Sequence, residues 1–220
     1  MATENNRRLR FGVDTGGTFT DLLIEGVDEN LRLYKQPTTP SDPIQGLLDV
    51  IKYAANDLDF SVEQLLAQAD TLVHGTTRAT NAIVENKTAR TAFITTKGHR
   101  DMLLVREGGG RHVPMDYSQE YPAPYIPRSL SFEIAERIFA DGRVVEKIDL
   151  ESTIKTIEEI RNKEVETVAV CLLWSVVNPL HEIELGKLLD QHLPDIPYTL
   201  SHQLNPAIRE YRRASSTAID

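Results

Sequence analysis

The stretch that decides the fold is FGVDTGGTFTDLLIEG, residues 11–26. It places an aspartate, two glycines and two threonines between short apolar runs. These runs predict two β-strands, Arg10–Asp14 and Phe19–Glu25, joined through the glycine pair. Because glycine tolerates positive φ, we expect the pair to form a tight turn in that conformation. Leu31–Gln36 predicts a third strand, so the chain opens with a small hairpin sheet.

The composition of this turn indicates phosphate chemistry. Without side chains, the backbone N–H groups of Gly16 and Gly17 can approach an anion closely. Thr18 and Thr20 add hydroxyl donors, which strand alternation would aim at one face. Asp14 would repel a phosphate by roughly 4 kcal/mol at about 4 Å unless a cation intervened. It therefore fits a Mg²⁺ ligand acting through water. The alternative is a hairpin whose aspartate and threonines merely close the turn.

Helices and strands alternate along the rest of the chain, which predicts an α/β domain with a mixed sheet and flanking helices. Pro43 is placed to open one helix, and Ser61 with Gln64 predicts a capping box at the start of another. The other predicted elements are strands over 71–75, 91–96 and 165–174 and helices over 77–86 and 179–193. Residues 106–129 predict a long irregular loop, either functional or a plain surface excursion.

Composition excludes several classes of function. The 220 residues are 40% apolar and 26% charged, as in an ordinary soluble protein. No apolar run approaches the roughly 20 residues of a membrane span, and the opening MATENNRRLR lacks the apolar core of a secretory signal. The net charge of -9 argues against a nucleic-acid backbone as partner. We therefore expect a cytoplasmic protein that binds neither membranes nor nucleic acid.

Several familiar site types are also excluded. The single cysteine, Cys171, permits neither an internal disulfide nor a cysteine-built zinc site, and its apolar neighbours predict a core position. HEIEL, residues 181–185, lacks the second histidine of a zinc-protease helix. No Gly-Lys-Ser/Thr follows the glycine pair, and no G-x-G-x-x-G opens a helix. The turn is therefore neither a Walker loop nor a dinucleotide fingerprint.

A second candidate anion site is HGTTRATNAIVEN, residues 74–86. Its glycine and threonines lie at a predicted strand-to-helix junction, where backbone N–H groups and the helix dipole favour an anion. The candidate binding residues are Gly75, Thr76, Thr77 and Asn81. Either threonine could instead simply cap the helix. His74 and Arg78 have two interpretations each, as site residues or as an ordinary core histidine and a solvated arginine.

The order of these motifs along the chain resembles that of known protein families. Strand, Asp-x-Gly-Gly-Thr-x-Thr-Asp and strand resemble the first phosphate loop of the actin, sugar kinase and Hsp70 superfamily, whose domains are ribonuclease H-like. With HGTTRATNAIVEN, the chain resembles the N-terminal region of the hydantoinase A, 5-oxoprolinase and acetone/acetophenone carboxylase family. The match continues through AFITTKGHRDMLLV, YPAPYIPRSLSFEIAERIFADG, VAVCLLWSVVNPLHE and SHQLNPAIREYRRASSTAID. REGG, residues 106–109, looks more like the acetophenone carboxylase branch.

The resemblance implies an ATP-dependent enzyme that uses Mg²⁺ or Mn²⁺. In the carboxylase branch ATP activates bicarbonate and a ketone enol by phosphorylation; in the hydrolase branch it activates a cyclic amide. Asp14 would be the catalytic metal ligand, and Asp21 would orient the loop or assist water, or merely close the turn. A hydantoinase B-type partner subunit is also implied. A sugar or acyl kinase and a non-catalytic assembly domain stay open as alternatives.

The resemblance also implies a domain boundary. Residues 1–200 would form the N-terminal domain with the first phosphate loop, and residues 201–220 would start the main domain with the second. Family members are much longer, so we expect a piece of a longer protein or a split subunit, catalytically incomplete alone. From Ser201 onward, the sparse apolar residues Ile208, Tyr211 and Ile219 predict a loosely held helical tail.

Overall fold

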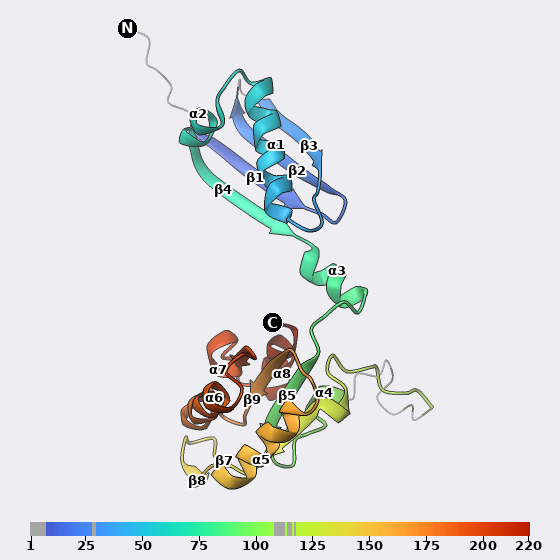
Figure 1. The fold of residues 1–220 in the computed structure, drawn as a ribbon, viewed down its shortest axis with the longest axis vertical. Coiled ribbons are helices and arrows are strands. Elements are labelled where there is room, and N and C mark those ends of the chain that lie inside the picture. Colours follow the sequence, from blue (N-terminus) through green and yellow to red (C-terminus); the bar gives the residue numbers. More distant parts are fainter. Residues whose placement is uncertain (1–7, 28–29, 108–112, 114–115, 117) are drawn as a thin grey trace. The chain divides into compact units, whose positions relative to one another are not determined.

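The chain forms two compact units, Met1–Thr88 and Ala89–Asp220, here called the N-terminal unit and the C-terminal unit. Each has its own sheet and its own hydrophobic core, which confirms the predicted α/β class. The expected boundary at residue 200 concerns longer chains and stays a prediction. The computed structural model (Figure 1) describes residues 8–27, 30–107, 113, 116 and 118–220.

The N-terminal unit is built on the predicted hairpin sheet. Its first three strands are β1 (Leu9–Thr15), β2 (Phe19–Val27) and β3 (Asn30–Pro37), and each pairs antiparallel with the next. The fourth, β4 (Ala69–Thr76), pairs parallel with β1. The order across the sheet is β3-β2-β1-β4. Because β1 and β4 are parallel neighbours, their carboxyl ends lie side by side at the same end of the sheet. Both candidate anion-binding segments begin there.

Two capped helices follow β3. Helix α1 (Pro43–Asp57) begins at the proline expected to open it, and the Asp42 side chain accepts hydrogen bonds from two N–H groups of the first turn. Helix α2 (Val62–Ala67) begins with the predicted capping box, in which Ser61 and Gln64 bond reciprocally. Both helix starts are thus confirmed, and they show that short polar signals define these boundaries.

Helix α1 covers only one face of the N-terminal sheet (Figure 1). Residues of β1 alternate between buried and exposed, with Phe11 and Val13 in the core and Asp14 exposed on the opposite face. Gly46 lets the helix approach closely, because a Cβ there would lie 3.1 Å from Thr20 Oγ1. The sheet therefore has a packed inner face and an exposed outer face.

A short helix, α3 (Arg78–Val84), follows β4 inside the predicted range 77–86. It starts directly at the candidate anion-binding junction. Its residues are exposed or half-buried, and none joins the hydrophobic core of the N-terminal unit.

The C-terminal unit contains a second, fully parallel sheet in the order β10-β9-β5-β6. Its strands are β5 (Thr91–Thr96), β6 (Ser131–Ile134), β9 (Thr167–Cys171) and β10 (Tyr198–Leu200). A two-stranded sheet, β7 (Arg137–Ile138) with β8 (Val144–Glu146), lies beyond β6. The helices are α4 (Met102–Val105), α5 (Leu150–Arg161), α6 (Leu180–His192), α7 (Ser201–Leu204) and α8 (Glu210–Ile219).

The central strands of this sheet are buried, as their apolar sequences predict. Every residue of β9 after Thr167 is buried, and so is β5 after Thr91. The prediction of a strand through residue 174 is too long, because Trp174 has a φ of 56° and turns the chain away. Helix α6 agrees with the predicted 179–193 within one residue at each end.

The long irregular loop is confirmed for its described residues. Helix α4 ends at Val105, and the next regular element among the described residues is a 3₁₀ turn, Arg128–Leu130. Residues 108–112, 114–115 and 117 lie outside the described part of the chain.

The prediction of a loosely held tail after Ser201 is wrong. Helix α8 packs against β9, and it buries Arg213, Ala214 and Thr217 completely or almost so. The reason is that the tail does have a surface to pack on, formed by β9 together with α7 and α4. The residue that holds α8 in place is the buried Arg213, and a search for apolar residues could not identify it.

Candidate functional site

The glycine turn connects β1 to β2 through a short, closed loop. The Gly16 N–H donates to the Phe19 carbonyl oxygen at 2.9 Å, so Gly17 and Thr18 form the tip. The Thr18 carbonyl accepts from the Thr38 N–H at 2.9 Å, which ties the tip to the end of β3. The loop is thus fixed by one hydrogen bond within the turn and by one to the segment after β3.

The expected positive φ at this turn is wrong. Among described residues, the glycines with positive φ are Gly26, Gly98 and Gly142. Gly16 is favoured for a different reason: a Cβ there would lie 3.1 Å from the Phe19 carbonyl oxygen, which is closer than most real Cβ contacts. The turn therefore needs glycine for space rather than for handedness.

The two threonines of the turn do not share a strand face, contrary to expectation. Thr18 precedes β2 and is exposed, whereas Thr20 is fully buried and its hydroxyl lies 2.9 Å from the Thr38 hydroxyl. Thr20 therefore ties the loop to the segment that follows β3 instead of facing solvent. Direct contact of its hydroxyl with a phosphate is not supported by this burial.

The strand-to-helix junction lies beside the turn. The Thr76 hydroxyl donates to the Thr15 carbonyl at 2.9 Å and accepts from the Arg78 N–H at 3.2 Å. Thr77 is the N-cap residue of α3, but its side chain makes no capping bond; the Asn81 amide donates to its hydroxyl at 3.4 Å. The side chain of Thr77 therefore does not cap α3.

A cavity of about 440 Å³ separates the turn from α3. Four of the predicted binding residues line it: Gly16, Gly17, Thr76 and Asn81. A Cβ on Gly17 would lie 3.8 Å from the Asn81 amide nitrogen, so the two segments approach each other across it. The other lining residues are Thr15, Thr38, Pro40, Pro43, Arg78, Ala82, Glu85 and Lys87.

The chemistry of this lining suits an anion. Backbone N–H groups, threonine hydroxyls and one amide supply neutral donors, and Arg78 and Lys87 supply positive charge. Lys87 lies 2.7 Å from Glu85, so Arg78 is the cation without a carboxylate partner among the described residues. The sequence left Arg78 open as a site residue or a solvated arginine; it is exposed and it also lines the cavity.

The two aspartates lie elsewhere. Asp14 and Asp21 are directly opposite in the β1–β2 register, on the outer face of the sheet, and neither lines the cavity. Lys35, the register partner of Asp21 on β3, lies 3.0 Å from its carboxylate. Asp14, aligned with Gly75 on β4, is left exposed. The structure thus separates the predicted site residues into a cavity group and a carboxylate pair.

Three further residues support the two groups: His74, which the sequence left open, and Lys35 and Thr38, which sequence reasoning missed. His74 is not a core histidine; its ring nitrogen lies 2.9 Å from the Thr15 hydroxyl beside the cavity. Lys35 could have been found by aligning the three strands, because it falls opposite Asp21 in the hairpin register. Thr38 could not, since its role depends on how the loop after β3 folds back.

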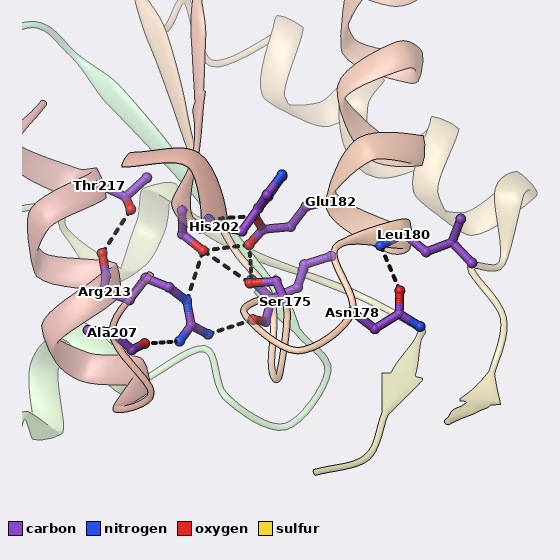
Figure 2. A network of polar contacts seen from close by, with 10 residues as sticks. Ser175, Asn178, Leu180, Glu182, His202, Ala207, Arg213 and Thr217 are labelled. Carbon is purple, nitrogen blue, oxygen red and sulfur yellow. Dashed lines mark hydrogen bonds and ion pairs between the residues drawn. The ribbon is translucent and has the colours of Figure 1, made fainter. Parts of the chain in front are cut away.

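The C-terminal unit has its own polar cluster, which the sequence did not predict. The Glu182 carboxylate accepts from the Ser201 hydroxyl, from the His202 N–H and from Leu172 N–H, and it contacts the His202 ring at 2.6 Å (Figure 2). The Arg213 guanidinium donates to the Ser201 hydroxyl at 3.0 Å. Glu182, Ser201 and Arg213 are fully buried, so this network ties α6, α7 and α8 together.

Burial alone would raise the pKa of Glu182. The hydrogen bonds from His202, Ser201 and two backbone N–H groups outweigh it and lower the pKa below the ordinary 4.5. A second buried pair joins His181 to Glu136 at 2.6 Å, with the Thr96 hydroxyl also donating to Glu136. The HEIEL segment thus serves packing, as its missing second histidine indicates.

Cys171 is a core residue, as predicted. It is fully buried, and burial raises the pKa of its thiol to about 12. The described residues contain no cluster of three metal-ligating side chains. No helix among them is long and apolar enough to cross a membrane.

Comparison with known proteins identifies the family. The model of the hydantoinase/oxoprolinase N-terminal region matches residues 10–193. This chain is 32% identical to caprolactamase subunit alpha of Pseudomonas jessenii, over 98% of this chain and 31% of that protein. It is 31% identical to the acetophenone carboxylase gamma subunit of Aromatoleum aromaticum, over 94% and 30%. The chain belongs to the hydantoinase/oxoprolinase N-terminal family, which includes ATP-dependent carboxylases and amide hydrolases.

The fold agrees with a solved relative. The nucleotide-free structure of acetone carboxylase has the same fold over this region, with a TM-score of 0.87 at 23% identity. The match covers 97% of this chain and 32% of that one. This chain thus spans less than a third of the relatives it matches.

Proposed function

We propose that the N-terminal unit binds the phosphate groups of ATP in the cavity between the glycine turn and α3. The observation that carries the proposal is that Gly16 and Gly17 meet Thr76 and Asn81 across one 440 Å³ space. Two segments about 60 residues apart in sequence each expose donors there, and neither segment packs an apolar side chain from the core into it.

The physical argument is that phosphate needs donors and positive charge without bulk. Glycines let backbone N–H groups approach the anion, and Arg78 adds a guanidinium that can bind two phosphate oxygens. In phosphoryl transfer the protein contributes mainly positioning and charge neutralisation. The contribution of this unit would be to hold the triphosphate in place.

The two carboxylates lie outside the cavity lining, but Asp14 directly precedes Thr15, which lines it, so in this proposal a Mg²⁺ or Mn²⁺ ion held by Asp14 through water would also reach the phosphates. Mg²⁺ is commonly held by one or two carboxylates together with phosphates and water, so the lack of a three-ligand cluster among described residues is compatible with it. Asp14, exposed and without an ion pair among described residues, would hold the ion through water; Asp21, paired with Lys35, would orient the loop or assist water. The ion would supply neutralisation of phosphate charge.

The proposed reaction is ATP-dependent activation of a carbonyl compound. Biotin-independent carboxylation of a ketone with bicarbonate, as in an acetophenone carboxylase, is one form; opening of a cyclic amide is the other. Relatives named for each form are equally similar to this chain, at 31% and 32% identity. Both forms use the same phosphate site, so the site alone does not choose between them.

Three further points belong to this proposal. The N-terminal unit would be the actin-like, ribonuclease H-like half of a nucleotide clamp, supported by its β3-β2-β1-β4 order. The partner would be a hydantoinase B-type subunit, since the relatives are named as subunits. The compartment would be the cytoplasm, in keeping with an acidic chain.

The test uses the longer protein with its partner. Mg-ATP binding is measured by calorimetry for the wild type and for Asp14→Ala, and ADP release is then followed with ketone or cyclic amide, with and without bicarbonate. We expect ADP release to require Asp14. Bicarbonate dependence with a ketone indicates the carboxylase, and bicarbonate independence with a cyclic amide indicates the hydrolase. Unchanged Mg-ATP affinity in a folded Asp14→Ala protein would contradict the metal assignment.

A further inference from the structure

A row of three threonines crosses the N-terminal sheet beside the cavity between the glycine turn and α3, here called the phosphate cavity. Thr15 on β1 lies opposite Thr20 on β2 and opposite Thr76 on β4. Residues directly opposite on neighbouring strands point to the same side of a sheet, so these three side chains lie next to one another. Thr15 and Thr76 line the phosphate cavity, whereas Thr20 is fully buried behind it.

The three hydroxyl groups differ in where their protons go. A threonine hydroxyl has one proton to donate and two lone pairs that accept. The Thr76 hydroxyl donates its proton to the Thr15 carbonyl, and the Thr20 hydroxyl pairs with that of Thr38. The Thr15 hydroxyl lies 2.9 Å from Nε2 of His74, a nitrogen that donates in one tautomer of the ring and accepts in the other. A histidine therefore decides where the proton of Thr15 points.

His74 reaches Thr15 diagonally across two paired strands. It lies in register with Val13, two residues before Thr15 on β1, so the ring and the hydroxyl are on the same face of the sheet. Thr15 is 4% exposed, whereas His74 is exposed and does not belong to the described residues that line the phosphate cavity. The ring therefore acts on the cavity through the Thr15 hydroxyl.

The two directions of this hydrogen bond have opposite consequences for an anion. When Nε2 carries no proton it accepts from Thr15, and the Thr15 oxygen then presents only lone pairs to the cavity, which repel a phosphate oxygen. When Nε2 carries a proton it donates to the Thr15 oxygen, and the hydroxyl proton is free to turn into the cavity. A hydrogen bond to a charged acceptor is stronger than one between neutral groups, so a bound phosphate favours the second direction.

We propose that His74 is a positioning residue of the phosphate cavity: Nε2–H of its ring donates to the Thr15 oxygen, so that the Thr15 hydroxyl donates to a phosphate oxygen of the ligand. The inference rests on the proposed function, because it concerns phosphate groups in that cavity. It adds Thr15 as a phosphate contact and gives His74, which touches no ligand, the role of setting the direction of that contact.

The ring nitrogens of His74 report the proposed direction. Ring ¹⁵N NMR spectra of the 220-residue chain are recorded at about pH 8, above the usual pKa of histidine, before and after saturation with Mg-ATP. The signals of His74 are identified by their loss in His74→Gln. We expect Nε2 of His74 to carry a proton in the complex, and the ring of His99 in the C-terminal unit to remain unchanged. An Nε2 without a proton in the saturated complex would overturn the proposal.

His74→Gln and His74→Glu form a matched pair, because the two side chains have the same shape but only the amide can donate to Thr15. NMR titration with Mg-ATP measures their affinities. His74→Gln should bind within about twofold of wild type, since it keeps a donor. His74→Glu should bind about tenfold or more weakly, because a carboxylate takes the Thr15 proton away from the cavity and also repels the ligand.

The Thr15→Val variant separates these two effects of the carboxylate. It keeps the shape of Thr15 and removes the hydroxyl, so it should itself weaken binding about tenfold. In the Thr15→Val protein the difference between glutamine and glutamate at position 74 should fall to about threefold, which is the part due to charge alone. If Thr15→Val does not fold, Thr15→Ala replaces it. An equal difference with and without the Thr15 hydroxyl would overturn the proposal, and so would equal binding by His74→Gln and His74→Glu.

The inference and the proposed function fail in different ways. Saturable shifts at Gly16 and Gly17 in a complex whose His74 Nε2 carries no proton would overturn the inference and leave the proposed function standing. Absence of any shift at the glycine turn of the wild type would contradict the proposed function and the inference with it.

Discussion

The N-terminal unit arranges polar side chains around an open cavity, whereas the C-terminal unit buries and pairs them. Gly16, Thr76 and Arg78 line open space, while Glu182 and Arg213 are fully buried in a network that reaches three helices. The same residue types thus serve different purposes. Buried and paired polar groups define how helices pack, and accessible donors at strand ends are available to a ligand.

The two sheets also differ in how far their faces are buried. The C-terminal sheet is buried along its central strands, but the N-terminal sheet has α1 on one face and exposes Leu33 and Val73 on the other, at 67% and 62%. We therefore expect substitutions of polar residues to act on stability in the C-terminal unit and on ligand binding in the N-terminal unit.

The largest expected effect is on stability. Arg213→Ala removes a buried guanidinium that donates to the Ser201 hydroxyl and to three backbone carbonyls. Breaking a buried ionic network costs about 3–5 kcal/mol in the free energy of unfolding. Urea denaturation measures it. Arg212→Ala is the matched control, since that side chain is exposed, pairs with Glu107 at 3.4 Å and should change stability little. Equal effects of the two variants would contradict the structural role of Arg213.

The second effect is on affinity. Gly17→Val places a branched side chain in the cavity, close to Asn81, and should weaken Mg-ATP binding at least about tenfold, which corresponds to about 1.4 kcal/mol. Gly12→Val is the control, because Gly12 lies on the outer sheet face, where a Cβ makes an ordinary 3.7 Å contact with Leu23. Calorimetry that finds both variants equally weakened in a folded protein would count against the cavity.

The third effect depends on pH. The pKa of Glu182 is lowered in the folded chain, so the unfolded chain binds more protons in the interval below 4.5. The stability contributed by Glu182 is therefore fully present above pH 4.5 and is lost as the pH falls through the lowered pKa. Denaturation of wild type and Glu182→Gln across this interval should show a shallower pH slope in the variant. Glu158→Gln is an exposed control, and identical slopes in all three would be inconsistent with the network.

The smallest effect concerns the loop beneath the cavity. Thr20→Val removes the hydroxyl that bonds Thr38 but keeps the shape, and it should lower the stability of the N-terminal unit by about 1 kcal/mol. Thr18→Val, at the exposed tip, should have no measurable effect. If Thr20→Val instead abolished nucleotide binding without loss of stability, the Thr20 hydroxyl would be a ligand contact after all.

Local patterns predicted most of the N-terminal unit. Strand alternation gave the hairpin sheet, and Pro43 and the Ser61–Gln64 pair gave the helix starts, because these signals act within a few residues. The glycine turn and the junction at Thr76 were both predictable as donor-rich segments. That they face one cavity was not readable from the spacing, since it depends on the parallel pairing of β4 with β1.

The C-terminal unit was less predictable. Its short strand β10 and the packing of α8 depend on contacts between segments distant in sequence, and the anchoring residue, Arg213, has no apolar signature. Similarly, the turn needed glycine at position 16 for space beside the Phe19 carbonyl, which only the folded loop reveals. Local sequence predicts elements; it does not predict which polar side chains are buried together.

Backbone amide NMR of the 220-residue chain during a titration with Mg-ATP tests the phosphate cavity most directly. We predict saturable shifts at Gly16, Gly17, Thr76 and Asn81, with weak affinity because this chain would supply one wall of the nucleotide site. The amides around Glu182 and Arg213 should not move. Saturable shifts confined to the C-terminal unit, or no shifts at the glycine turn and the α3 junction, would contradict phosphate binding by the N-terminal unit.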